Sequence, residues 1–152
     1  FGLSEQRMGR VLRHKPRDAF AISTKVGRML EPGADLARAR DGYVDGLPFA
    51  VRFDYGADAV RRSIEGSLAR LGLDRVDIAL IHDPAEDTHG DAWPDRFDEA
   101  MRGAAAALTR LREEGTIRAW GIGTNRVEPC LLALERADPD IFLLAGRHSL
   151  LD

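Results

Sequence analysis

The chain has 152 residues, of which 44% are hydrophobic and 31% are charged, and its formal net charge is −3. This composition is typical of a globular protein with a buried core, and it differs from that of disordered or fibrous chains. The slight acidic excess offers no basic surface, so we expect neither nucleic acid nor a membrane surface as a partner. No apolar run approaches the roughly 20 residues that a helix needs to cross a bilayer.

A single cysteine, Cys130, is too few for an intrachain disulfide, and the first residues show no charged and then apolar leader. Both features are typical of proteins that stay in a reducing compartment. The sequence therefore predicts a cytoplasmic protein.

The first third of the chain predicts a helix, a strand and a long loop. Residues 4–12 begin with a serine followed by acidic and amide residues and carry apolar side chains at helical spacing, which predicts a helix. Residues 19–26 are apolar and β-branched, which predicts a buried strand with Thr24-Lys25 near its end. From residue 28 to 56, glycine and proline interrupt every periodicity, so we expect a loop of the length that commonly carries function.

Beyond residue 56 the apolar spacing alternates between the helical and the strand period. The predicted helices span residues 57–71, 97–112 and 127–137. The predicted strands span residues 76–81, 117–122 and 141–145. A polar loop is expected between the second strand and the second of these helices. Because the strands are apolar on both faces, they predict a parallel sheet covered by helices.

Two folds contain such a sheet: the doubly wound open sheet and the (β/α)8 barrel. The four predicted strands, together with their helices and loops, take up most of the chain. A barrel typically needs eight strands and about 250 residues. The chain also starts at Phe1 without an initiator methionine and stops soon after its fourth predicted strand. We therefore expect missing segments on both sides, with residues 1–152 as the central part of one barrel domain.

Polar residues lie at or just beyond the end of each predicted strand. The four strands end in Thr24-Lys25, His82-Asp83, Thr124-Asn125 and Arg147-His148. A polar strand end is ordinary by itself, since a solvated lysine or a helix-capping asparagine explains it equally well. Four such ends at one rim are stronger evidence, because ligands of α/β proteins bind at the carboxyl ends of the strands.

These residues suit carbonyl chemistry. A lysine lowers the pKa of an adjacent phenol, and a neutral histidine can donate a hydrogen bond to a carbonyl oxygen. Lys25 and His82 are therefore the candidate catalytic residues. Thr124 and Asn125 have the donor and acceptor groups that would hold an amide, such as the carboxamide of a nicotinamide ring. The set lacks a proton donor.

Five segments resemble the aldo-keto reductase family in order and spacing, over essentially the whole chain. They are GLSEQRMGRVLR, ISTKVGR, SLARLGLDRVDIALIHDP, LREEGTIRAWGIGTN and RHSLLD. The branch they resemble most contains aldose 1-dehydrogenases and pyridoxal 4-dehydrogenases. The resemblance implies a TIM barrel, of which roughly the third to sixth strands and their helices are present. It also implies an NAD(P)(H)-dependent oxidoreductase that transfers a hydride between nicotinamide and an aldose, or a related aldehyde or alcohol.

The resemblance assigns a role to each candidate. Lys25 corresponds to the lysine that lowers the pKa of the family's catalytic tyrosine, and His82 to the histidine that orients the substrate oxygen. Thr124-Asn125 matches the pair that contacts the nicotinamide carboxamide. The first five residues look like the tail of the segment that carries the catalytic tyrosine, which would place that tyrosine and the catalytic aspartate before Phe1. We therefore expect the 152-residue chain to be inactive by itself.

One departure from the family lies after the last predicted strand. Many members carry a glutamine there against the nicotinamide, whereas this chain has Ala145-Gly146-Arg147. The change suits the aldose dehydrogenase branch.

Several other interpretations stay open. Phe53 and Tyr55 are candidate substrate-binding residues in the long loop, although Asp54 and Tyr55 are better explained by capping and loop packing. A cluster of metal-ligand residue types lacks the spacing of a rigid metal site, so no metal is expected. Its members are His82, Asp83, Asp87, His89 and Asp91. Two alternatives to the oxidoreductase are a Schiff-base lyase with Lys25 as nucleophile and a non-catalytic subunit on the same fold.

Overall fold

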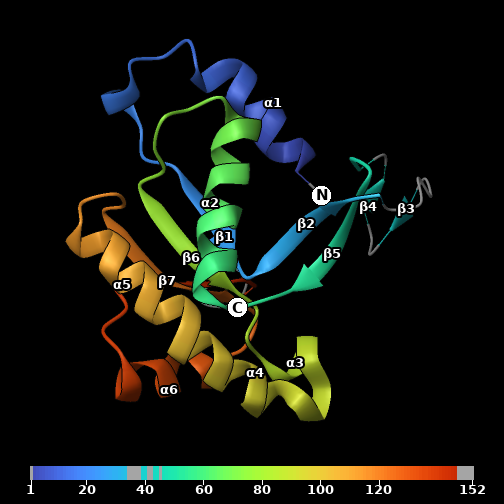
Figure 1. Ribbon diagram of the computed structural model, residues 1–152, viewed down its shortest axis with the longest axis vertical. Coiled ribbons are helices and arrows are strands. Elements are labelled where there is room, and N and C mark those ends of the chain that lie inside the picture. The colour runs from blue at the N-terminus through green and yellow to red at the C-terminus, as the bar shows by residue number, and fades with distance from the viewer. Residues whose placement is uncertain (1, 34–38, 41–42, 45, 147–152) are drawn as a thin grey trace.

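A computed structural model describes the chain except for residues 1, 34–38, 41–42, 45 and 147–152. Its centre is a parallel sheet of four strands in the spatial order β1-β6-β7-β8 (Figure 1). The strands are β1 (Ser23–Val26), β6 (Ile78–His82), β7 (Ala119–Thr124) and β8 (Ile141–Leu144). Each neighbouring pair is joined by a helical crossover, as parallel strands require. The predicted parallel sheet is confirmed.

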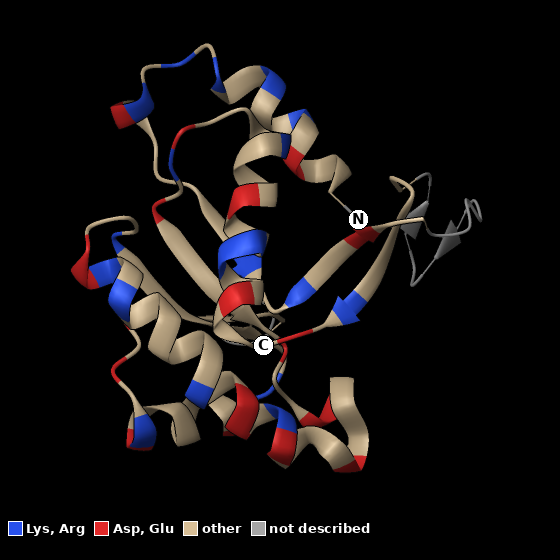
Figure 2. Ribbon diagram, in the orientation of Figure 1, with Lys and Arg blue, Asp and Glu red and all other residues tan. Residues whose placement is uncertain are grey.

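The helices are α1 (Leu3–Leu12), α2 (Ala57–Leu71), α3 (Glu86–His89), α4 (Trp93–Glu99), α5 (Ala106–Glu113) and α6 (Glu128–Arg136). The predicted helix 57–71 is confirmed to the residue, because Gly72 adopts the left-handed conformation (φ 65°) that ends a helix. Acidic and basic side chains are interspersed along α2 and α4 (Figure 2). Within the described residues, no helix is both long enough and apolar enough to span a bilayer.

The helices pack against one face of the sheet. Alternate strand residues on that face have no exposed surface, and they are Val26, Ala79, Ile81, Trp120 and Ile122. The opposite face carries Lys25, Leu80, His82, Gly121 and Gly123, which pair in register across β1, β6 and β7. On edge strand β8, Ile141 and Leu143 are 39% and 47% exposed. A parallel sheet with helices on one face is the arrangement of a partial barrel.

The expectation of a loop from residue 28 to 56 is wrong. Two strands, β2 (Arg28–Pro32) and β5 (Phe49–Phe53), form an antiparallel hairpin, and two short strands, β3 (Ala39–Arg40) and β4 (Tyr43–Val44), lie between them. Gly33, Gly46 and Pro48 all fall between β2 and β5, so these residues separate the strands without interrupting them.

The segment before residue 97 also differs from the expected polar loop. It contains α3, a 3-10 turn η2 (Gly90–Ala92) and α4. Helix α4 begins at Trp93 because Pro94 lies in its first turn, where a proline ring costs no hydrogen bond. The predicted helix 97–112 is a continuation of α4 through a π-helical segment, η3 (Ala100–Ala105), into α5.

Buried Asp77 ties the amino ends of the strands together. Its side chain is 2% exposed, and its Oδ2 accepts hydrogen bonds from Arg17 Nη2 at 2.6 Å and from the Ile22 amide at 2.8 Å. The backbone amide of Arg118 donates to the Asp77 carbonyl at 2.8 Å. The carboxylate and the backbone carbonyl of this one residue therefore connect the entries of β1, β6 and β7, at the end of the sheet opposite Lys25 and His82.

Replacing Asp77 should destabilise the protein strongly. Asp77→Ala removes the carboxylate that pairs with the Arg17 guanidinium and accepts from the Ile22 amide, which should lower the free energy of unfolding by about 3 kcal/mol. Urea titration measures this difference. Asp98→Ala, which breaks a half-exposed ion pair with Arg136, is the control and should change stability far less. Equal shifts in the two variants would contradict the role given to Asp77.

The same carboxylate should make stability depend on pH. Burial by itself raises the pKa of Asp77, but hydrogen bonds from Arg17 and Ile22 outweigh burial and hold the pKa below its usual value. A lowered pKa stabilises the fold above about pH 4 and loses that contribution as pH falls through the folded-state pKa. The wild type should therefore lose more stability than Asp77→Asn between about pH 5 and pH 3. Thermal unfolding at each pH tests the comparison.

Candidate functional site

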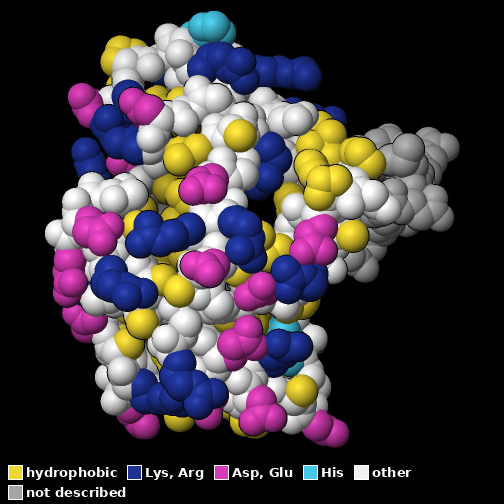
Figure 3. Space-filling model, in the orientation of Figure 1, with side chains coloured by type: hydrophobic (Ala, Val, Ile, Leu, Met, Phe, Trp, Pro, Cys, Tyr) yellow, Lys and Arg dark blue, Asp and Glu magenta, His cyan; other side chains and the backbone are white. Residues whose placement is uncertain are grey.

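Lys25 and His82 lie on the same face of the sheet, at the carboxyl ends of adjacent strands. In the parallel register Lys25 pairs with Leu80, so His82 lies one side-chain repeat further along β6 on the same face. Both residues line one pocket of about 320 Å³. The wall between α2 and the β2–β5 hairpin includes Arg62, Ser63 and Val51, and Figure 3 shows the surface hollowed there.

Lys25 extends over β6 toward β7. A Cβ built on Gly123 would lie 2.8 Å from Lys25 Cε and 3.7 Å from Leu80 Cβ, so the lysine side chain crosses above Leu80 and covers the glycine. The side chain of Lys25 is half-buried. Within the described part of the chain, no carboxylate forms an ion pair with its ammonium group. Its charge is thus available to the pocket.

His82 is the last residue of β6, and its side chain is 24% exposed. Its Nε2 lies 3.2 Å from Asp83 Oδ2. Asp83 itself has φ 49°, an uncommon conformation for a residue with a side chain. The Asp83 amide still donates to the Gly123 carbonyl at 2.9 Å, which extends the pairing of β6 with β7 by one residue. The backbone therefore turns sharply at the residue that follows the histidine.

Thr124 does not lie on the pocket face. The register pairs His82 with Gly123, so the side chain of Thr124 points to the helix-covered face, where the residue is 2% exposed. Its Oγ1 accepts a hydrogen bond from the Arg126 amide at 3.2 Å. Asn125 is exposed at the rim, and its Nδ2 donates to Asp87 Oδ2 at 3.3 Å. The fourth predicted strand end, Arg147-His148, lies outside the described residues.

The two candidate substrate-binding residues are placed differently from each other. Tyr55 has no exposed surface and is not among the residues that line the pocket. Its hydroxyl donates to the His82 carbonyl at 2.8 Å, and burial, followed by the charge of Asp83, raises the pKa of the phenol. Phe53 is half-buried, and its ring meets the edge of the His89 ring at 4.7 Å between centroids. No local pattern in the sequence indicates the link between Tyr55 and His82.

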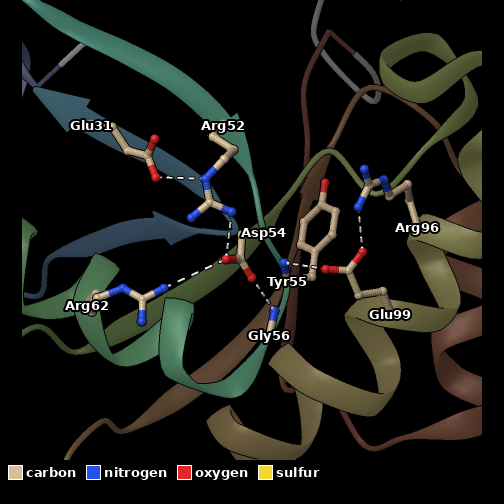
Figure 4. A network of polar contacts seen from close by, with 8 residues as sticks. All are labelled: Glu31, Arg52, Asp54, Tyr55, Gly56, Arg62, Arg96 and Glu99. Carbon is tan, nitrogen blue, oxygen red and sulfur yellow. Dashed lines mark hydrogen bonds and ion pairs between the residues drawn. The ribbon is translucent and has the colours of Figure 1, made fainter. Parts of the chain in front are cut away.

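Asp54 organises the turn between the hairpin and α2, which confirms loop packing as its role (Figure 4). Its Oδ1 accepts from the Gly56 amide at 3.0 Å, and its Oδ2 accepts from Arg52 Nη1 at 2.9 Å. Arg62 Nη2 lies 3.7 Å from the same oxygen. Burial alone raises the pKa of Asp54, but the Gly56 amide and the two arginines lower it overall. Asp54 is therefore a charged carboxylate whose two oxygens are already paired with groups of the protein itself.

The residue types of the candidate metal cluster are dispersed. Among the described residues, no three histidine, cysteine, aspartate or glutamate side chains are placed to hold a metal ion. His89 instead has its Nε2 2.8 Å from the Tyr55 hydroxyl.

Of the two residues predicted to contact a nicotinamide carboxamide, only one is suitably placed in this structure. The Thr124 hydroxyl is buried and already accepts a hydrogen bond, so it does not suit this contact. The exposed amide of Asn125 has the required donor and acceptor groups. Beside His82, Gly123 has no side chain of its own, and the Lys25 side chain covers it in this structure.

The two glycines of β7 should respond differently to a methyl group. A Cβ on Gly121 would lie 1.6 Å from the Ile141 carbonyl oxygen, whereas the closest atom to a Cβ on Gly123 is Lys25 Cε at 2.8 Å, near the far end of a flexible side chain. Gly121→Ala should therefore destabilise the protein by more than about 2 kcal/mol, and Gly123→Ala by less than about 1 kcal/mol. Thermal denaturation of both variants checks this order. A reversed order would show that β7 is not packed as described.

Comparison with known proteins gives a family match. A sequence model of the aldo/keto reductase family matches residues 1–152. Pyridoxal 4-dehydrogenase from Microbacterium luteolum is 40% identical and matches 100% of this chain and 47% of its own length. D-threo-aldose 1-dehydrogenase from a Pseudomonas species is 38% identical and matches 99% of this chain and 45% of its own length. The chain thus spans about half the length of these curated relatives.

A solved relative extends the comparison to the fold and the cofactor. The aldo/keto reductase from Klebsiella pneumoniae, determined in complex with NADP and acetate, is 26% identical and superimposes with a TM-score of 0.55. The match covers 90% of this chain and 35% of that protein.

Proposed function

This chain belongs to the aldo/keto reductase family, and from this premise we propose that residues 1–152 form the central part of a (β/α)8-barrel oxidoreductase. The complete enzyme transfers a hydride between NAD(P)(H) and an aldose, or a related aldehyde or alcohol. The observation that carries the proposal is the placement of Lys25 and His82 on one face of adjacent strands, in one pocket at their carboxyl ends. Active sites of barrel enzymes lie at that end of the strands.

The two side chains have complementary roles in this chemistry. The Lys25 ammonium has no acidic partner among the described residues, so it is able to stabilise the anionic form of a neighbouring phenol. The His82 ring is partly exposed to the pocket and can donate a hydrogen bond to the substrate oxygen. A phenol whose anion Lys25 stabilises would take the hydroxyl proton during oxidation and return it during reduction.

Tyr55 is not that phenol. It is buried, its hydroxyl is already bonded to the His82 carbonyl, and its raised pKa disfavours the anion. The resemblance of residues 1–5 to the family segment that carries the acid–base tyrosine supports the assignment of that tyrosine, and of the family aspartate, to a part of the complete enzyme that precedes Phe1.

When bound, NAD(P) supplies the hydride acceptor or donor. The exposed Asn125 amide is the group of this chain best suited to hold its carboxamide. The aldose and pyridoxal dehydrogenases among the relatives support small polar aldehydes and sugars as the substrate class. The arginines that line the pocket offer such molecules hydrogen-bond donors, and the Ser63 hydroxyl, which donates to the Lys25 carbonyl at 3.3 Å, offers an acceptor.

Substitutions of the two catalytic candidates test the proposal in the complete enzyme. Lys25→Met and His82→Gln should each lower kcat by roughly 100-fold or more, because each removes a group that acts on the reacting oxygen or its proton. The rate is followed as NAD(P)H absorbance with aldoses and pyridoxal. Lys15→Met and His14→Gln, which alter exposed residues far from the pocket, are matched controls and should keep the wild-type rate. Wild-type rates in the Lys25 and His82 variants would refute these assignments.

Borohydride trapping separates this chemistry from that of a lyase. A Schiff-base enzyme would accumulate a reduced adduct on Lys25 when borohydride is added with a carbonyl substrate. We expect mass spectrometry to find no such adduct. An adduct on Lys25 that is absent in Lys25→Met would favour the lyase.

The 152-residue chain should show no turnover by itself, because the acid–base tyrosine is assigned to another segment. The absorbance assay with NAD or NADP tests this expectation. Appreciable turnover would mean that the proton donor lies within residues 1–152, and it would overturn that assignment.

A further inference from the structure

We propose that Tyr55 and His89 are positioning residues that hold His82 and Lys25 in their working arrangement. The inference rests on the proposed function, since it concerns how the same site is held in shape. Neither residue is itself part of the pocket lining. They act from beneath it, through the backbone at the ends of β1 and β6.

The first contact is made by the hydroxyl of Tyr55. It donates its single hydrogen to the His82 carbonyl at 2.8 Å, and the Asp83 carbonyl lies 3.3 Å away. The hydroxyl oxygen lies 2.8 Å from His89 Nε2. Because the hydroxyl hydrogen is already used, His89 must be the donor in this second bond. The backbone at the catalytic histidine is thus held by a chain of two hydrogen bonds that begins at His89.

The second contact is made by the ring of Tyr55. A Cβ on Gly27 would lie 2.4 Å from Tyr55 Cδ1, so the ring lies directly against the glycine backbone. Gly27 has φ 91° and stands two residues after Lys25. The Gly27 carbonyl also accepts a hydrogen bond from the Asp54 amide at 3.0 Å. One side chain therefore contacts the ends of both strands that carry the catalytic pair.

The backbone of Tyr55 is itself held firmly. Its amide donates to Glu99 Oε1 at 3.0 Å, and Glu99 pairs with Arg96 at 2.7 Å (Figure 4). A Cβ on Gly103, in the π-helical segment η3, would lie 2.4 Å from the Tyr55 carbonyl oxygen, so the two backbones touch. Such segments are frequent at functional sites. Tyr55 is therefore enclosed and has little freedom to move away from His82.

His89 reaches Tyr55 from the other side of the turn that follows β6. It ends the short helix α3, and the His89 ring stands edge-on to Phe53 at 4.7 Å with an interplanar angle of 77°. Its ring is half-buried. The hairpin residue Phe53 and the phenol hydroxyl together fix the orientation of this imidazole. The Tyr55 hydroxyl therefore contacts both ends of the turn, at the Asp83 carbonyl and at His89 Nε2.

A purely space-filling role would not require the hydroxyl. A phenylalanine would occupy nearly the same volume against Gly27, so Tyr55→Phe removes the hydrogen bonds and keeps the packing. The variant leaves the His82 carbonyl and the His89 N–H without this partner. The turn at Asp83, which already has an uncommon φ of 49°, would then be free to relax and to move the His82 ring.

The test uses the complete enzyme and three variants. Tyr55→Phe and His89→Leu should each lower kcat by roughly 10-fold to 100-fold, the size of effect expected when a catalytic group is misplaced by up to about 1 Å. The dissociation constant of NAD(P), measured by fluorescence, should stay within about twofold, since neither residue lies at the proposed cofactor contact. His89→Gln, whose amide nitrogen can take the place of Nε2 as donor, should recover most of the activity.

A control separates positioning from general destabilisation. Ile117→Val removes one methyl group from a buried residue at the amino end of β7, far from the pocket, and should leave kcat unchanged. The second readout is independent of turnover: the NMR signals of the His82 ring should shift in Tyr55→Phe and stay in place in Ile117→Val. An active wild type with unchanged kcat and unmoved His82 signals in Tyr55→Phe would overturn the inference. An inactive wild type whose His82 signals shift would overturn the proposed function and leave the positioning role supported.

Discussion

The parallel register of β1, β6 and β7 is the constraint on which the site depends. It sets Lys25 opposite Leu80 and His82 opposite Gly123, so that the cation and the imidazole share one face of the sheet. A shift of one residue would turn every side chain of a strand to the other face. Asp77 opposes such a shift by bonding the entries of the three strands at the far end of the sheet. The stabilising contacts of Asp77 and the candidate catalytic residues therefore lie at opposite ends of the same strands.

Much of the fold could be predicted from local patterns. Helix α2 was predicted to the residue because an amphipathic run ends at a glycine that adopts a left-handed conformation. Lys25 and His82 are candidate catalytic residues because each lies near the end of a short apolar strand, and the family resemblance suggests their roles. The hairpin of β2 and β5 was missed because its strands lack the alternation of polar and apolar residues that marks a half-buried sheet.

The parts of the site that were not predicted depend on contacts between distant segments. Thr124 has a suitable side chain for a ligand, but the register turns it toward the helices, and no local pattern reveals that choice of face. Tyr55 bonds to residues 27 and 34 positions further along the chain, so its role emerges only when β6 and α3 are in place. Gly27, Gly103 and Gly123 matter because they lack a side chain, and the sequence does not show what approaches them.

The direction of the hydrogen bonds around Tyr55 has a consequence for the tautomer of His89. Because Nε2 must carry the hydrogen, the neutral ring is held as the Nε2–H tautomer. Burial, followed by the charge of Arg96, lowers the pKa of His89, so this neutral form prevails near neutrality. Protonation would add a hydrogen at Nδ1 and leave the bond from Nε2 in place. The imidazole beneath the site is thus a donor in either charge state, whereas the imidazole above it, on His82, faces the pocket.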